Sequence, residues 1–211
     1  MQIKIAVANH KGGSSKTTTC LLVATNLASD TFSVAVVDLD PQASASMWCA
    51  AGQGNFPVKV VPATAETLSE VLAGLADMDA VFLDCPPSST APETLAALDV
   101  ADLVVIPCAP SPLDYWATDA MHIAAGLRRP EVPRLVVVTQ ASHTNLATEM
   151  AGHIRTTWST ARAQLASRTV YREAAALGKS LRQMPGRTNH DAVAELDALS
   201  VEVLTTAIRS K

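Results

Sequence analysis

Short apolar runs alternate along the chain with longer segments in which apolar residues recur every three or four positions. The runs are rich in Val, Ile and Leu and alternate little with polar residues, which is typical of strands buried on both faces of a parallel sheet. The strands predicted in this way are Gln2–Ala8, Ser33–Asp38, Val58–Val61, Ala80–Asp84, Leu103–Pro107 and Leu135–Thr139.

The segments between these strands have helical spacing. The predicted helices are Thr17–Ser29, Thr64–Leu75, Glu93–Leu98, Tyr115–Arg128, Asn145–Ala161 and Asp191–Ile208. Alternating strands and helices indicate βαβ units, so the predicted fold class is α/β, a mostly parallel twisted sheet with helices on both faces. Proline and glycine occur at strand ends rather than in one long linker, so we expect residues 1–211 to form a single domain.

Composition narrows the class of protein. Of the 211 residues 48% are hydrophobic but only 4% aromatic, so the core must be aliphatic. The longest apolar runs are far shorter than the ~20 residues that span a bilayer, and no secretory signal is visible. The four cysteines form no Cys-x-x-Cys pair, so neither a tetrahedral metal site nor a disulfide framework is expected. We expect a cytoplasmic protein.

Charge is unevenly distributed along the chain. The net charge is −4, but residues 1–127 carry −9, residues 128–190 carry +7, and residues 191–211 carry −2. A localised basic region on an otherwise acidic protein suggests a polyanionic partner. The alternative is that the arginines of this region form an ordinary solvated helix face.

A phosphate-binding loop is predicted directly after the first strand. The general motif G-x-x-x-x-G-K-[ST] wraps phosphates in backbone N–H groups and neutralises them with its lysine. Here Lys16-Thr17 matches its end, while His10 and Ser15 occupy the two glycine positions. The strand before the loop, the Gly12-Gly13 pair within it and the helix after it favour a phosphate site. The alternative is a Gly/Ser turn that holds lysines by chance.

Three carboxylates lie at or just beyond the ends of the second and fourth strands. They are Asp38, Asp40 and Asp84. A carboxylate at the tip of an apolar strand is costly to bury unless it is paired, metal-bound or hydrated. Their convergence beside a phosphate loop predicts a Mg²⁺–nucleotide site, in which Thr17 binds the ion directly and Asp84 binds it through water. For Asp38, an N-capping or loop-bracing function is an equal alternative.

These motifs together resemble a known family. The run Lys11-Gly-Gly-x-x-Lys16-Thr-Thr is similar to the deviant Walker A motif of the ParA/MinD class of P-loop ATPases. Asp38-Leu-Asp-Pro-Gln42 and Asp84-Cys-Pro-Pro87 look like the two other motifs of that class. The stretches 104–115 and 168–178 further resemble small partition ATPases of the ParF type, so the likeness covers essentially the whole chain.

The resemblance implies a slow, partner-stimulated, Mg²⁺-dependent ATPase that binds ATP or ADP and forms a homodimer in the ATP state. Lys16 would contact the β- and γ-phosphates, Lys11 would reach the partner subunit's phosphates, and Asp40 would position the attacking water. The implied nucleotide-binding residues are Lys11, Gly12, Gly13, Ser14, Ser15, Lys16, Thr17, Thr18 and Gln140. The implied metal-binding residues are Thr17, Asp40 and Asp84. The resemblance also places adenine near Thr139-Gln140 and the dimer interface near Pro107–Pro112.

Ser15 departs from this family's pattern, which has glycine at that position. A non-glycine residue with positive φ costs roughly 1 kcal/mol. The substitution is therefore expected to lower nucleotide affinity or to open the turn slightly.

The function implied is that of a partition ATPase, whose ATP-bound dimer binds DNA without sequence preference and releases it on hydrolysis. It would segregate or position plasmid DNA, chromosomal DNA or a protein cargo, work with a ParB-like or adaptor protein, and associate with the nucleoid. The candidate DNA-binding residues are Arg155, Arg162, Arg168, Arg172, Lys179 and Arg187. Arg155 and Arg162 lie seven residues apart in one predicted helix, hence on one face. The alternative for Arg168 and Arg172 is ion pairing with Glu173 or Asp191.

The sequence leaves four alternative functions. A MinD-like membrane-cycling ATPase needs a terminal amphipathic helix rich in cations, which the acidic last 21 residues do not supply. Lys11 argues against most metabolic P-loop enzymes. An iron–sulfur relative would need Cys85 and Cys108 at a dimer axis, but buried structural thiols are the better interpretation. A nucleotide-binding module with impaired hydrolysis has only Ser15 in its favour.

Overall fold

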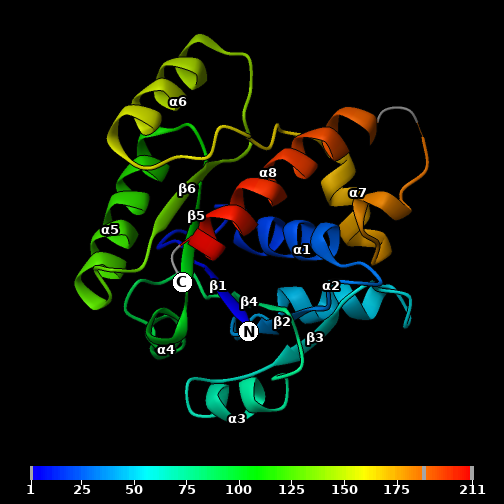
Figure 1. Ribbon diagram of the computed structural model, residues 1–211. Coiled ribbons are helices and arrows are strands. Elements are labelled where there is room, and N and C mark those ends of the chain that lie inside the picture. The colour runs from blue at the N-terminus through cyan, green and yellow to red at the C-terminus, as the bar shows by residue number, and fades with distance from the viewer. Residues whose placement is uncertain (1, 187–188, 210–211) are drawn as a thin grey trace.

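The computed structural model describes residues 2–186 and 189–209, and in them six strands form one sheet (Figure 1). The strands are β1 (Ile3–Val7), β2 (Val34–Asp38), β3 (Lys59–Pro62), β4 (Ala80–Asp84), β5 (Leu103–Cys108) and β6 (Arg134–Val138). Their order across the sheet is β3-β2-β4-β1-β5-β6, and every neighbouring pair is parallel. The predicted α/β fold with a parallel sheet is confirmed.

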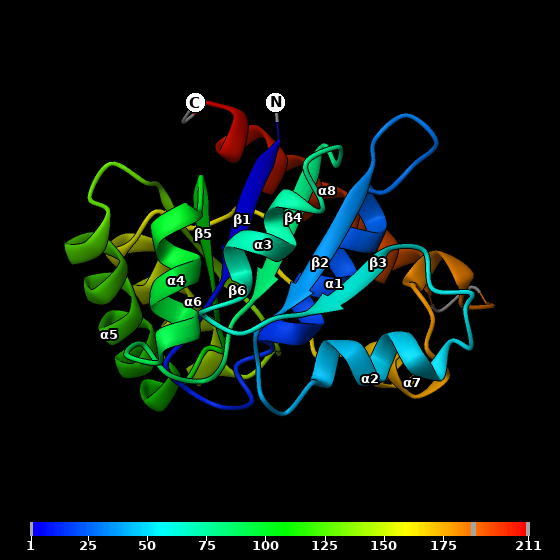
Figure 2. The ribbon, with the colours of Figure 1, turned by 90° about the horizontal axis from the view of Figure 1, so that it is seen from below.

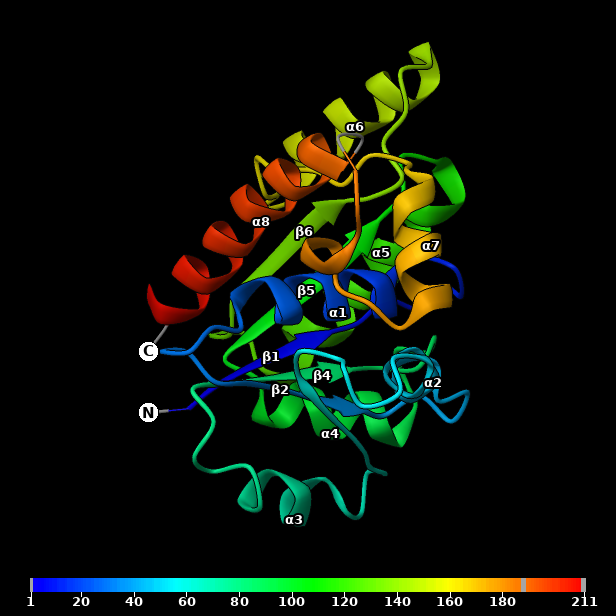
Figure 3. The same cartoon turned by 90° about the vertical axis from the view of Figure 1, so that its right-hand side faces the viewer.

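Helices cover both faces of the sheet. They are α1 (Lys16–Leu27), α2 (Ser44–Ala51), α3 (Leu68–Ala73), α4 (Pro92–Val100), α5 (Pro112–Arg128), α6 (Asn145–Thr157), α7 (Thr169–Leu177) and α8 (His190–Arg209), with a 3₁₀ turn at Leu181–Gln183. Figure 3 shows α1 and α8 on one side of the sheet and α3 and α4 on the other. Figure 2 looks onto the face that α3 and α4 cover.

Two hydrophobic cores lie on the two faces because side chains alternate along each strand. On β1, Ile3, Ile5 and Val7 pack with α1 and α8, while Ala6 points into the core shared with α4 and α5. Strands with both faces covered are apolar throughout, which is why these runs lack polar alternation. None of the helices among the described residues combines the length and apolar character that a bilayer span requires.

Two helices were missed by the sequence analysis. The periodicity of α2 and α7 is too short to stand out, since they have eight and nine residues. Gly178 ends α7 with φ 60°, a left-handed conformation that favours glycine. A Cβ at Gly178 would lie 1.8 Å from the backbone nitrogen of Gly52, so only glycine lets the ends of α2 and α7 approach this closely.

The sheet brings three strand ends together. Asp84 at the end of β4 is the register partner both of Val7 on β1 and of Asp38 on β2. The strand order changes direction at β1, because β2 lies on one side of it and β5 on the other. Ligands of open α/β sheets bind at such a switch point, beyond the carboxyl ends of the strands.

Candidate nucleotide site

The loop between β1 and α1 is anchored at its start by the buried amide of Asn9. Its Nδ2 donates to the carbonyl oxygen of Pro107 at 2.7 Å, and its Oδ1 accepts from the backbone N–H of Lys11 at 3.2 Å. Further along, Gly13 and Ser15 have φ of 77° and 69°. Ser15 therefore adopts the positive φ expected from the motif, although its side chain disfavours that conformation.

Lys16 begins α1 and is almost completely buried, with 7% of the residue exposed. Its ammonium donates to the carbonyl oxygen of Lys11 at 3.0 Å. Burial lowers its pKa, and the nearby carboxylates of Asp84 and Asp40 oppose that effect. An ammonium has three protons to donate, so a buried lysine with one such bond can still bind an anion.

Asp84 lies beneath the same loop and is fully buried. Neither carboxylate oxygen has a regular hydrogen-bond partner among the described residues, and the same holds for the Oγ of Ser14. Burial raises the pKa of Asp84 to about 7; Asp38 adds to the rise, while the Thr17 hydroxyl and Lys16 oppose it. Unpaired buried polar groups are costly, so this arrangement suits a site that a cation and an anion complete.

Asp38 and Asp40 differ in their surroundings. Asp38 accepts from both the backbone N–H and the hydroxyl of Ser46, at 2.8 and 2.7 Å. It thereby provides an acceptor for a backbone N–H in the first turn of α2. The loop-bracing interpretation of Asp38 is confirmed. Asp40 is partly exposed, lines the cavity described below, and accepts from the backbone N–H of Gln42 at 2.9 Å through one oxygen.

A magnesium ion would fit here with few protein ligands. Among the described residues, no three His, Cys, Asp or Glu side chains converge to hold a metal by themselves. Mg²⁺ usually keeps several waters and binds one or two carboxylates together with substrate phosphates. The unpaired Asp84 carboxylate and the neighbouring Thr17 hydroxyl satisfy that pattern.

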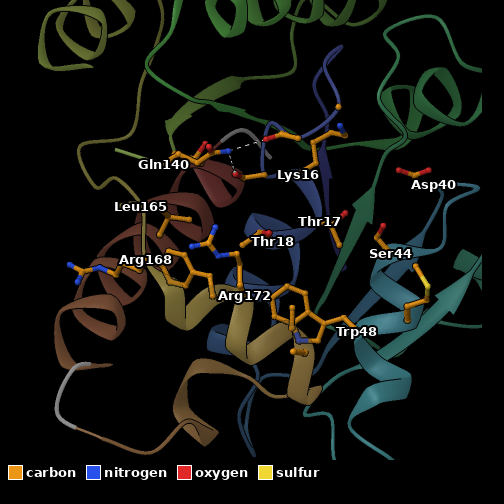
Figure 4. Close-up of a pocket in the computed structure, with 18 of the residues that line it drawn as sticks. Lys16, Thr17, Thr18, Asp40, Ser44, Trp48, Gln140, Leu165, Arg168 and Arg172 are labelled. Carbon is orange, nitrogen blue, oxygen red and sulfur yellow. Dashed lines mark hydrogen bonds between the residues drawn. The ribbon is translucent and has the colours of Figure 1, made fainter. Parts of the chain in front are cut away.

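A cavity of about 860 Å³ opens beside the loop (Figure 4). The phosphate loop forms one wall, and α2 and α7 form another through Trp48 and Arg172. The indole N–H of Trp48 donates to the carbonyl oxygen of Lys179 at 3.1 Å, which ties α2 to the chain after α7. The sequence analysis missed Trp48 and Tyr171 as cavity residues. Their aromatic character in a chain so poor in aromatics was the only available signal.

Gln140 also lies at this cavity, where the sequence predicted a nucleotide contact. Its side-chain amide is directed at the phosphate loop and donates to the carbonyl oxygen of Gly13 and to Ser15 Oγ, both at 2.9 Å.

Lys11 forms an ion pair within its own chain. Its ammonium lies 2.8 Å from Oδ2 of Asp114, a nearly buried carboxylate in the first turn of α5. The Ser111 hydroxyl donates to the same carboxylate oxygen. The structure therefore gives Lys11 a carboxylate partner that the sequence analysis did not identify.

The candidate DNA-binding arginines do not form one group. Helix α6 ends at Thr157, so Arg162 lies beyond it and the predicted shared helix face with Arg155 is wrong. Arg168 pairs with Glu195 on α8, at 2.6 Å, and not with either carboxylate expected. Arg155 donates to the carbonyl oxygen of Ala161 at 2.7 Å. Arg187 lies outside the described residues.

Arg162, Arg172 and Lys179 differ from Arg168. None of the three forms an ion pair among the described residues. Arg162 and Arg172 are exposed, and Lys179 is half-buried.

Comparison with known proteins identifies what the chain is similar to. The profile of a family described as "CobQ/CobB/MinD/ParA nucleotide binding domain" matches residues 5–205. Two curated proteins named maintenance of carboxysome distribution protein A are also similar. The one from Gloeobacter kilaueensis is 38% identical over 84 residues, 40% of this chain and 38% of that protein. The one from Halothiobacillus neapolitanus is 29% identical over 95% of both chains.

Solved structures share the fold. A plasmid partition protein of Borrelia burgdorferi bound to AMPPNP has a TM-score of 0.77 and 18% identity, over 97% of this chain and 99% of that one. The septum site-determining protein MinD of Pyrococcus horikoshii, complexed with Mg-ADP, has a TM-score of 0.74 and 18% identity, over 97% and 98% of the two chains.

Proposed function

The chain belongs to the CobQ/CobB/MinD/ParA nucleotide-binding domain family, and on that premise we propose that it is a Mg²⁺-dependent ATPase of the ParA type. It hydrolyses ATP slowly, forms a homodimer in the ATP state and positions a cargo. The whole chain, residues 1–211, acts as one nucleotide-binding domain.

One observation carries the proposal: a buried lysine and a buried, unpaired carboxylate lie beneath the same loop. Lys16 has protons to donate, and Asp84 has two oxygens without a regular hydrogen-bond partner among the described residues. A magnesium–phosphate group would supply acceptors for the remaining protons of Lys16 and a cation for the carboxylate oxygens of Asp84. An adjacent cavity of about 860 Å³ is large enough for the rest of a nucleotide.

The residues divide the chemistry among them. Lys16 and the backbone N–H groups from Gly12 to Thr18 would hold the phosphates, while Thr17 and Asp84 would hold Mg²⁺. When bound, Mg²⁺ neutralises charge on the β- and γ-phosphates. Asp40 orients the attacking water, because it is the partly exposed carboxylate at the cavity. Phosphoryl transfer depends mainly on such positioning and on charge neutralisation.

Lys11 connects the site to a second subunit. In the single chain its ammonium is held by Asp114. In the ATP-bound dimer Lys11 leaves that carboxylate and binds the partner's phosphates, which carry more negative charge than a single carboxylate. The dimer thereby gains a charge-assisted contact that neither monomer has.

The cargo is DNA or a protein assembly. The names of the relatives, a plasmid partition protein and two carboxysome distribution proteins, support positioning as the function. We propose that Arg162, Arg172 and Lys179 contribute to a non-specific DNA surface on the nucleoid, because none of the three forms an ion pair within the described part of the chain. A ParB-like or adaptor protein would stimulate hydrolysis in the cytoplasm.

Analytical ultracentrifugation with AMPPNP and Mg²⁺ tests this function. The wild-type chain should dimerise, and the dimer should bind random-sequence DNA. Lys11→Ala should bind AMPPNP but stay monomeric, whereas Asp40→Ala should dimerise and lose turnover. The matched control is Lys59→Ala, at an exposed lysine of β3. A wild-type chain that binds no nucleotide, or a Lys11→Ala chain that dimerises normally, would overturn the proposal.

A further inference from the structure

Two residues with left-handed backbone contact one another in the lining of the cavity. Ser15 has φ 69° and Gln140 has φ 52°, a conformation that disfavours residues with a Cβ. They are 125 positions apart in the sequence, yet Gln140 Nε2 lies 2.9 Å from Ser15 Oγ and 2.9 Å from the carbonyl oxygen of Gly13. Strained residues that contact each other at a site have a structural or functional reason to be held there.

The chemistry of the contact fixes the orientation of the amide. A carbonyl oxygen can only accept, so the –NH₂ end of Gln140 must face Gly13, and its two protons serve the two oxygens. Ser15 Oγ acts as an acceptor, which leaves its hydroxyl proton free to donate to an anion. The Gly13 carbonyl and the Ser14 N–H lie on opposite edges of one planar peptide. Holding the carbonyl toward Gln140 therefore aims the Ser14 N–H to the other side of the loop.

The backbone around Gln140 is itself tied to the far wall of the cavity. The N–H of Ala141 donates to the carbonyl oxygen of Leu165 at 3.1 Å, and the N–H of Ser167 donates to the carbonyl oxygen of Ala141 at 2.9 Å. Leu165 and Ser167 both line the cavity. The Gln140 side chain thus connects this wall to the phosphate loop.

We propose that Gln140 is a positioning residue for the phosphate loop. Its amide binds the hydroxyl that Ser15 carries in place of the glycine of the general motif, and so holds Gly13 and Ser15 in the phosphate-binding conformation before nucleotide arrives. We call this contact between the Gln140 amide and the Ser15 hydroxyl the latch. In this view the serine does more than replace the glycine of the motif, because its hydroxyl forms half of the latch. This inference rests on the proposed function, because the ligand it concerns is a nucleotide.

A double-mutant cycle on AMPPNP affinity with Mg²⁺, measured by calorimetry, tests the latch. Ser15→Ala removes the hydroxyl and keeps the Cβ, so it retains the backbone strain. Gln140→Ala should weaken binding about fivefold when Ser15 is present and about twofold or less when Ala replaces it. Gln53→Ala is the matched control, because Gln53 is an exposed glutamine that also has a left-handed φ, 49°, but lies outside the cavity lining.

The same cycle measured on urea unfolding of the nucleotide-free chain separates the outcomes. Coupling in both measurements supports the proposal. Additive effects on unfolding would show that no latch exists, and coupling on unfolding alone would overturn the positioning role and leave a structural contact. If the wild-type chain binds no nucleotide, the proposed function fails and the positioning role with it. The unfolding cycle still decides whether the latch exists.

Discussion

Two regions of the molecule remove carboxylates from solvent wholly or in part: the phosphate-loop edge of the sheet and the contact of α8 with residues 161–168, which we call the clamp. They differ in whether those carboxylates have hydrogen-bond partners. In the clamp, Glu195 accepts from the Arg168 guanidinium at 2.6 Å and from the backbone N–H of Ala166 at 3.1 Å. Glu202, seven residues later on the same helix, accepts from the backbone N–H groups of Arg162 and Ala163, both at 2.8 Å. At the phosphate loop, Asp84 has no regular partner among the described residues.

The pKa values of the two carboxylates diverge for this reason. Burial alone would raise the pKa of Glu195, but its bonds to Arg168 and Ala166 outweigh burial and lower it. The pKa of Asp84 rises to about 7 because burial dominates there. Charges whose hydrogen bonds are satisfied within the protein indicate a structural role, whereas a buried carboxylate without such bonds indicates a ligand that is to be bound. The comparison predicts that variants at the loop change binding and that variants which break the Arg168–Glu195 pair of the clamp change stability.

The largest effect is expected for Lys16→Ala. Loss of the ammonium leaves bound phosphates without their nearest buried cation, so AMPPNP affinity should fall by about 100-fold or more. The unfolding free energy of the nucleotide-free chain should change less, because the lost hydrogen bond to Lys11 and the lost attraction to Asp84 are offset by relief of the burial that disfavours the charged ammonium. Calorimetry and urea unfolding measure the two quantities. A loss of stability with intact binding would show that Lys16 has a structural role and contradict its assignment to nucleotide binding.

A smaller effect, on stability, is expected for Glu195→Ala at the clamp. The change leaves the Arg168 guanidinium and the Ala166 N–H without their acceptor, so the free energy of unfolding should fall by about 2 kcal/mol. Glu173→Ala, at an exposed glutamate of α7, is the control and should be within about 0.5 kcal/mol of the wild type. Equal stability of the two variants would show that the clamp contributes nothing.

Asp84 should make the stability of the nucleotide-free chain depend on pH. Its pKa of about 7 lies above the ordinary carboxyl value, so the folded state holds the proton more tightly than the unfolded state. Stability should therefore fall as pH rises from about 4 to 7 relative to Asp84→Asn, with about 1–2 kcal/mol of that loss between about pH 5.5 and 7. Urea unfolding at several pH values measures the difference. If the unfolding free energies of the wild type and Asp84→Asn had the same pH dependence, the pKa of Asp84 would not be raised in the folded state. Asp30→Asn, at an exposed aspartate, is the control.

The smallest effect is expected on DNA binding, where Arg162 and Arg168 should behave differently. Arg162→Ala should weaken binding of random-sequence DNA by the AMPPNP-bound dimer about two- to threefold and flatten the salt slope by about 0.9. Arg168→Ala should leave that slope unchanged and lower the melting temperature, because its guanidinium pairs with Glu195. Fluorescence anisotropy across salt concentrations and thermal unfolding measure these effects. A flattened slope for Arg168→Ala alone would place the DNA contact at Arg168 instead of Arg162.

Local pattern was sufficient for the strands, for most helices and for the phosphate loop. Apolar runs identify buried strands. The phosphate-binding role of Lys16-Thr17 at the start of a helix can be recognised from the neighbouring residues alone. The positive φ at Ser15 followed from the same local comparison and is observed. These features depend on contacts within a few residues, which is the range over which spacing and residue type carry information.

Contacts between distant segments could not be predicted in this way. The pairing of Arg168 with Glu195, of Lys11 with Asp114 and of Gln140 with the phosphate loop each joins residues 27 to 127 positions apart. Several carboxylates could have served each cation, and only the packing of α8 and α5 on the sheet selects one. The sequence by itself determined the elements and the chemistry at the ends of the strands. The tertiary structure decided which charges are neutralised within the chain and which stay available for a ligand, because that choice depends on distances that only packing sets.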